Sequence, residues 1–337
     1  MKKYNFLNIC KFIMALFVVA VHINIFNIPI ENKKFFINFA IFINPLVVQI
    51  FFLSTGFFIG KKIEDVENMK ESDFDRIKKR FLKMIKLYII LTIVYMPMTI
   101  YGFIQYHCSI GKAVLFFIRN ILFIGENFNS WILWYLLSEI YGLMLIYLLG
   151  KKTNNNNNFI YIGAILLLLG IVINYFNGFQ FKSNIIILLQ KIIINIIPNG
   201  RILYSPLFIS LGIFISKHEK IKNNVLSTIL LITLFILNIF LDSVIIHIIS
   251  ISICSYIIFK YIINIDIKEE KIADYLKLAS VNLYFWHLFI WSIISYIIEG
   301  KVSNNYSINY YIITIAIIML FTTIQYFLQE RIKSLKS

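Results

Sequence analysis

The chain has 337 residues, of which 59% are hydrophobic and only 15% are charged, and its mean hydropathy is +0.79. This composition excludes an ordinary soluble domain, in which about 25% of the residues are charged. The formal net charge of +15 does not indicate a nucleic-acid binder, because the basic residues lie mostly in short segments between apolar runs. The sequence therefore predicts an all-α, polytopic membrane protein with no nucleic-acid partner.

The N-terminal residues 1–22 have the basic start and apolar body of a signal peptide, but no small-x-small cleavage site follows them. We therefore expect a retained first transmembrane helix. About 20 apolar residues cross a hydrocarbon core of roughly 30 Å, and apolar runs of about this length recur along the chain. The ten expected spans are 6–26, 36–60, 82–104, 131–149, 159–176, 202–217, 225–241, 244–263, 280–298 and 308–329.

Two further apolar stretches, 112–124 and 184–197, are shorter and are interrupted by Arg119 and Lys191. We place them as interfacial or re-entrant pieces of outer loops. The asparagine run at 154–158 is expected to be a tolerant loop. The three cysteines have no metal-ligand spacing and cannot all pair, so no metal site is predicted; they are Cys10, Cys108 and Cys254.

The distribution of basic residues predicts the orientation. With the N-terminus in the cytoplasm, 24 of the 32 Lys and Arg residues lie in inside segments and 8 lie outside, as the positive-inside rule requires. The C-terminus is then cytoplasmic as well. We expect residues 1–337 to form a single integral domain of the cell membrane, packed around a polar interior.

The loop at 61–86 is the most basic segment on the predicted cytoplasmic side. Its cations include Arg76, Lys78, Lys79 and Arg80, and they form a candidate anion site. An equally good interpretation is that they set the orientation and contact anionic lipid.

Lys11 and His22 share one face of the first span. Eleven residues turn a helix by about 1100°, so the two side chains are some 20° from full registry and about 16 Å apart along the axis. At that distance they cannot form a salt bridge. A polar group in a membrane helix is costly, which favours a function for His22, whereas Lys11 could equally snorkel to the interface.

Similar polar stripes recur in other spans. They consist of Asn38, Phe42, Pro45, Gln49, Phe52 and Gly56 in the second; Trp131, Tyr135, Ser138 or Glu139, and Gly142 in the fourth; Ser280, Tyr284, His287, Trp291 and Ser295 in the ninth; and Thr322, Gln325 and Gln329 in the tenth. They predict helices that face a common interior.

The stripes also have a structural alternative, because small and polar residues hold membrane helices together. Glu139 could equally form a structural ion pair or act as a functional carboxylate. For His287 we favour packing, through a hydrogen-bonded element with Trp286.

Several motifs resemble those of the integral membrane acyltransferases of acyltransferase family 3. They are the basic residue, ten residues and histidine of Lys11 and His22; FFLSTGFFIG at 51–60; DRIKKRFLKMIKLY at 75–88; WYLLSE at 134–139; and LYFWHLFIW at 283–291. The resemblance covers nearly the whole chain. It has two departures: Lys11 replaces the usual arginine and loses its bidentate fork, and Thr55 replaces a serine.

The resemblance implies transfer of an acyl group, commonly acetyl, from cytoplasmic acyl-CoA to a hydroxyl, as in O-acetylation of an envelope or extracellular polysaccharide. Acyl-CoA is then a donor substrate, and no cofactor is permanently bound. On this basis we predict His22 as the general base, which Glu139 orients or polarises. The donor-binding residues are predicted to be Lys11, Arg76, Lys78, Lys79, Arg80, Tyr284 and His287.

Two other functions remain open at this stage. A transporter or flippase would also need a polar interior, but it would produce flux without a covalent product. A non-catalytic partner in an envelope-biosynthesis complex would tolerate substitution of His22.

Overall fold

The structure is a computed structural model that describes residues 4–25, 33–65, 69–151, 156–176, 178–218, 225–240, 244–302 and 308–335. These residues form helices and connecting turns and contain no strand. The α-helices are α1 Asn5–His22, α2 Lys33–Gly60, α3 Glu71–Gln105, α4 Ile110–Arg119, α5 Leu133–Gly150, α6 Asn156–Phe176, α7 Asn184–Ile196, α8 Ser205–Lys217, α9 Val225–Phe240, α10 Val244–Asn264, α11 Glu270–Glu299 and α12 Ile308–Ser334. A π-helix follows α4 at Asn120–Ile124, and a 3₁₀ turn precedes α8 at Arg201–Leu203.

Each expected span coincides with a helix. The predicted number of ten spans is nevertheless wrong, because fewer than ten helices in the described part of the chain are long and apolar enough to cross a membrane. Seven helices of the described residues are long and apolar enough to cross a membrane, namely α1, α2, α3, α5, α10, α11 and α12. The count rises to eight if α7 and the segment Arg201–Lys217, which meet at a bend of 71°, form one broken span.

Each of the three remaining expected spans is too short to cross a membrane by itself. The helix in the expected span 202–217 has 13 residues, and the apolar parts of α6 and α9 are Asn158–Asn174 and Val225–Asn238. At 1.5 Å per residue, none of these reaches roughly 30 Å. The predicted N-in, C-in orientation stays a prediction.

Some helices extend beyond the expected boundaries. α3 begins at Glu71 rather than 82, and α11 begins at Glu270 rather than 280, because charged turns precede the apolar part of each helix and hydropathy does not detect them. α6 begins inside the asparagine run, at Asn156, while residues 154 and 155 of that predicted loop lie outside the described residues. The expected span ends at 26 and 241 lie outside them as well.

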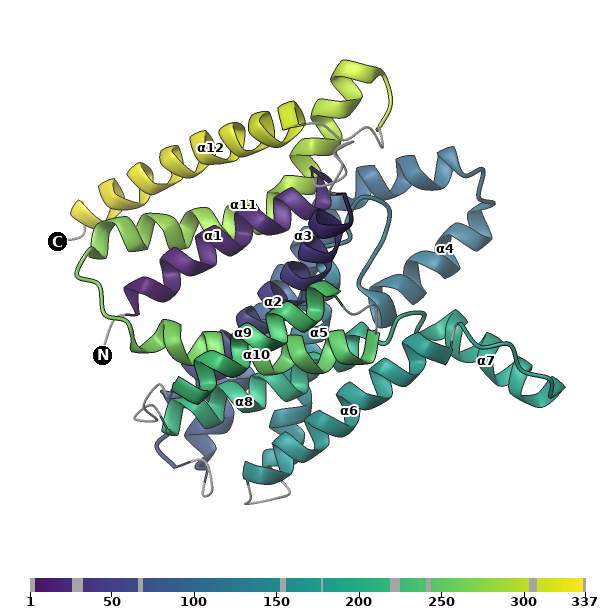
Figure 1. Ribbon diagram of the computed structural model, residues 1–337. Helices are drawn as coiled ribbons and strands as arrows, with labels where there is room; N and C mark the ends of the chain where they lie inside the picture. Colours follow the sequence, from purple (N-terminus) through teal and green to yellow (C-terminus); the bar gives the residue numbers. More distant parts are fainter. Residues whose placement is uncertain are drawn as a thin grey trace. The chain divides into compact units, whose positions relative to one another are not determined.

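The helices form two compact units, composed of the described residues of 1–48 and 221–337 and of 49–220. In the first unit, α1 packs along α11, and α12 covers another side of α11 (Figure 1). The contact between α11 and α12 includes hydrogen bonds from Asn282 Nδ2 to Thr322 Oγ1 at 3.0 Å and to Gln325 Oε1 at 2.8 Å. Two of the predicted polar-stripe residues of the last span therefore hold helices together.

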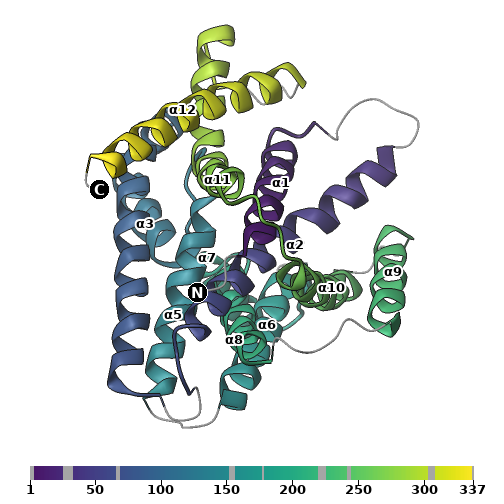
Figure 2. The ribbon, with the colours of Figure 1, turned by 90° about the vertical axis from the view of Figure 1, so that its left-hand side faces the viewer.

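In the second unit, α3 lies beside α5, and α8 packs against both α5 and α6 (Figure 2). The C-terminal part of α2 touches α8 through glycines. A Cβ atom built on Gly56 would lie 1.9 Å from the backbone oxygen of Ile209, and one on Gly212 would lie 2.1 Å from that of Leu53. This close approach places Thr55, the residue before Gly56, against the core of the unit.

Candidate functional site

The first group of predicted site residues lies in the first unit. His22 is the last residue of α1, Lys11 lies three turns earlier on the same helix, and both side chains are half-buried. The face of α1 that carries Ala15 and Val18 is buried. The helix thus carries a cation and an imidazole about 16 Å apart, as the sequence spacing indicates.

His287 of α11 lies next to His22. The two ring centroids are 5.3 Å apart and the ring planes are tilted by 33°. The His287 side chain is completely buried, and its Nδ1 lies 2.7 Å from the carbonyl oxygen of Leu283. Tyr284, one turn earlier on α11, is buried too. The structure therefore brings together three of the predicted site residues, His22, Tyr284 and His287, on two adjacent helices of one unit.

The second group lies in the other unit and is centred on Glu139. The Glu139 side chain of α5 is 1% exposed. Its Oε1 accepts hydrogen bonds from Arg80 Nη2 at 2.7 Å, Arg80 Nε at 3.2 Å and Thr55 Oγ1 at 3.2 Å. Glu139 thus takes part in an ion pair between α5 and α3. The predicted contact of Glu139 with His22 would join residues of the two units and stays a prediction.

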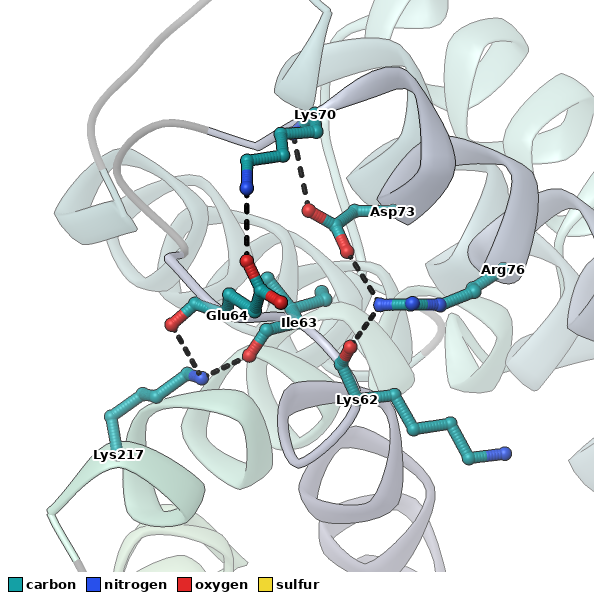
Figure 3. Close-up of polar contacts among 7 residues, drawn as sticks. All are labelled: Lys62, Ile63, Glu64, Lys70, Asp73, Arg76 and Lys217. Atoms are coloured by element: carbon teal, nitrogen blue, oxygen red, sulfur yellow. Dashed lines mark hydrogen bonds and ion pairs between the residues drawn. The ribbon is translucent and has the colours of Figure 1, made fainter.

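Residues 71–86 of the predicted loop belong to α3. Residues 62–64 lie against the start of α3 and the end of α8 (Figure 3). Lys217 Nζ donates to the backbone carbonyl oxygens of Ile63 and Glu64. The Glu64 carboxylate accepts from Lys70 Nζ at 2.9 Å, and this hydrogen bond lowers the pKa of Glu64 below its ordinary value. The ends of the loop at 61–65 and at Lys70 are therefore fixed by specific polar contacts.

Arg76 also belongs to this cluster. Its Nη1 donates to Asp73 Oδ1 at 2.9 Å and to the carbonyl oxygen of Lys62 (Figure 3). Asp73 is buried, and its Oδ2 accepts from the backbone N–H of Lys70, the residue that precedes α3. Asp73 therefore caps the helix and holds Arg76 at the same time.

The four cations predicted to bind donor phosphates are thus divided into two kinds. Arg76 and Arg80, one helical turn apart, point toward carboxylates of the fold, whereas the side chains of Lys78 and Lys79 are exposed. The helix period places residue 78 on the side opposite the face shared by 76 and 80, and residue 79 at the flank of that face.

Sequence reasoning missed several of these partners. Asp73 could have been found from its position in the first turn of α3, where an acidic residue caps the helix. Lys217 and the pair of Arg201 Nη1 with Glu126 Oε1, at 2.6 Å, have no local signal because the partners are far apart in the chain. Burial raises the pKa of Glu126, and Arg201 opposes that shift.

The described residues are those of an all-helical, polytopic membrane protein with two polar groupings, the half-buried His22 with the buried His287 and the buried Glu139 with Arg80. The chain matches the family model described as "Acyltransferase domain", that of acyltransferase family 3, over residues 4–327. Because the match covers nearly the whole chain, the protein belongs to this family and is a membrane acyltransferase. Neither a curated protein nor a solved structure matches the chain.

Proposed function

We propose that the protein transfers an acyl group, acetyl in the simplest case, from cytoplasmic acyl-CoA to a hydroxyl of an envelope or extracellular carbohydrate. The observation that carries this proposal is the imidazole of His22, half-buried at the end of a membrane helix and 5.3 Å from a second imidazole. Membership of the acyltransferase family supports a catalytic use of that imidazole over a packing role.

The proposed reaction needs one base. Neutral imidazole, with an unperturbed pKa near 6.5, is suited to take the proton of a hydroxyl at neutral pH. In the proposed step His22 removes this proton while the hydroxyl oxygen attacks the thioester carbonyl. The carbon–sulfur bond then breaks, an ester forms, and the coenzyme A thiolate takes the proton from the imidazolium of His22.

We propose that Lys11, Lys78 and Lys79 contact the acyl-CoA donor. Coenzyme A is long and carries several phosphates, so a cation at one end of its site and a base at the other suit its shape. Lys11, about 16 Å from His22 along α1, is one proposed contact of the donor, and the exposed Lys78 and Lys79 of α3 are the proposed contacts of its phosphates. Tyr284, on the buried face of α11, would border the thioester.

The decisive experiment measures acyl transfer directly. Purified protein in lipid nanodiscs is incubated with radiolabelled acetyl-CoA and fractionated envelope glycans, and the acylated acceptor is identified by mass spectrometry. His22→Ala is expected to lower the rate of transfer by roughly 10²–10⁴-fold, the usual contribution of a general base.

The matched control is His218→Ala, which removes an exposed imidazole at the end of α8 that stacks on Phe214 and should leave transfer unchanged. Undiminished transfer by a folded His22→Ala protein would disprove the catalytic role. Solute flux across proteoliposomes without any acylated product would instead support the transporter hypothesis.

The exposed lysines predict a specific effect on the donor. Lys78→Ala combined with Lys79→Ala should raise the KM for acyl-CoA by between 2-fold and about 30-fold, because each exposed ion pair contributes about 0.2–1 kcal/mol. The effect should shrink at high salt, which screens exposed charges. The control removes two exposed lysines from another segment, Lys182→Ala with Lys191→Ala. If the two double variants have the same KM for acyl-CoA, Lys78 and Lys79 do not bind the donor. They would then contact anionic lipid or set the orientation of the protein.

A further inference from the structure

His287 has one nitrogen whose role is fixed by the backbone. Its Nδ1 lies 2.7 Å from the carbonyl oxygen of Leu283, and a carbonyl oxygen only accepts hydrogen bonds, so Nδ1 must carry the proton. In the neutral ring the other nitrogen, Nε2, is then an acceptor with a free lone pair. The helix thus sets the tautomer of His287.

The second nitrogen has no such partner. His287 Nε2 is buried and has no hydrogen-bond partner among the described residues. Leaving a buried acceptor unsatisfied costs roughly 1–3 kcal/mol, and an apolar ring would fill the same volume without that cost. A role in packing alone therefore does not explain a histidine at this position.

His22 is a neighbour of His287 whose ring can donate a hydrogen bond. The two ring centroids are 5.3 Å apart, so nitrogens that turn toward each other come within hydrogen-bonding distance. Glu139, the carboxylate first predicted to orient His22, already accepts hydrogen bonds from Arg80 and Thr55. Catalytic bases are commonly held in place by a third group that accepts a hydrogen bond from their second ring nitrogen.

We infer that His287 is the positioning residue of the acyl transfer, an inference that rests on the proposed function. Its Nε2 accepts a hydrogen bond from a ring N–H of His22, which leaves the other nitrogen of His22 unprotonated and facing the acceptor hydroxyl. After His22 takes the hydroxyl proton, the same hydrogen bond stabilises the imidazolium until that proton passes to the departing thiolate. His287 itself gains and loses no proton.

The test compares two substitutions that differ in one property. His287→Phe keeps a planar ring but removes the acceptor, whereas His287→Gln places an amide oxygen near the position of Nε2. We expect the Phe variant to lower kcat by about 10- to 100-fold, as loss of an orienting partner does at other sites, with the KM values for donor and acceptor unchanged. The Gln variant should recover a substantial part of kcat.

His247→Phe is the matched control. His247 is a histidine of the same unit whose Nδ1 lies 2.6 Å from Asn238 Oδ1, and its loss should leave kcat unchanged. Thermal unfolding of each variant in detergent shows that the folded proteins are compared. If the Phe variant does not fold, the Gln variant together with a direct measurement of the tautomer still tests the inference.

That direct measurement is ¹⁵N NMR of the histidine-labelled protein, assigned with the His287→Gln variant. We expect His287 to be protonated at Nδ1 and to show a hydrogen-bonded Nε2 acceptor whose shift changes in His22→Ala. An Nε2–H tautomer, an unchanged kcat in His287→Phe, or a Gln variant no better than the Phe variant would overturn the inference. Loss of activity in His22→Ala with full activity in His287→Phe would overturn it while leaving the proposed function intact.

Discussion

Replacing Arg80 by methionine is expected to lower the free energy of unfolding by up to roughly 3–5 kcal/mol, the usual cost of leaving a buried charge without its partner. The reason is the partner that remains. Glu139 is 1% exposed, and without the two hydrogen bonds from Arg80 its carboxylate would keep only the one from Thr55. The measurement is reversible unfolding of the purified protein in detergent micelles, followed by circular dichroism.

The double variant Arg80→Met with Glu139→Leu should recover most of the lost stability. A buried pair replaced as a whole by apolar groups of similar size is often neutral, because neither charge is left behind. Lys70→Met is the control, since Lys70 and Glu64 form an exposed pair with side chains 69% and 78% accessible, and such pairs contribute about 0–1 kcal/mol. An Arg80→Met effect no larger than the Lys70→Met effect would show that the pair does not stabilise the fold.

The same cycle separates the two roles open to Arg80. If Arg80 only neutralises Glu139, the double variant should recover donor binding together with stability. If its guanidinium, whose side chain is 37% exposed, also contacts the phosphates of the donor, the double variant should be stable but keep a raised KM for acyl-CoA. The KM measured in nanodiscs therefore tests the predicted donor-binding role of Arg80 independently of its structural one.

The helices could be predicted from the sequence because membrane helices satisfy their own backbone polar groups and need long apolar runs. The boundaries were accurate where charges flank the apolar part, as at the end of α2. They were wrong at the start of α3 and of α11, where amphipathic turns continue the helix into charged sequence. The number of spans was overestimated because hydropathy does not distinguish a short apolar helix such as α8 from a complete span.

The register of Lys11 and His22 was predictable because it depends only on the helix period. The partners of the site residues were not predictable. Arg80 and Glu139 are 59 residues apart in the chain, and nothing local distinguishes Arg80 from Lys78 or Lys79 as the partner of a carboxylate. Likewise, the polar stripe of α11 indicates a buried face without showing that His287 lies against His22.

Glycine 56 of the FFLSTGFFIG segment has no room for a side chain. A Cβ atom there would lie 1.9 Å from the oxygen, 2.7 Å from the carbonyl carbon and 2.9 Å from the Cα atom of Ile209. These are backbone atoms of α8, so no side-chain rotation relieves the overlap. The contact is reciprocal, because a Cβ atom on Gly212 of α8 would lie 2.1 Å from the backbone oxygen of Leu53 of α2.

Gly56→Ala is therefore expected to lower the free energy of unfolding by about 1–3 kcal/mol or more, as overpacking of a closed core does. The expected activity loss is larger than the stability loss alone would produce, since moving α2 away from α8 also moves Thr55 from its hydrogen bond with Glu139. Unfolding in detergent and transfer by the folded fraction measure the two effects separately.

Gly111→Ala is the matched control, and its expected effect on the free energy of unfolding is zero or slightly stabilising. Gly111 is an exposed glycine in α4, and a Cβ atom on it would meet nothing within 4 Å. Alanine is preferred over glycine in a helix by up to about 1 kcal/mol, so this variant should be equally or slightly more stable than the natural protein and should transfer acyl groups at the same rate. Equal stability of the Gly56→Ala and Gly111→Ala proteins would contradict the close packing of α2 on α8, and with it the placement of Thr55 beside Glu139.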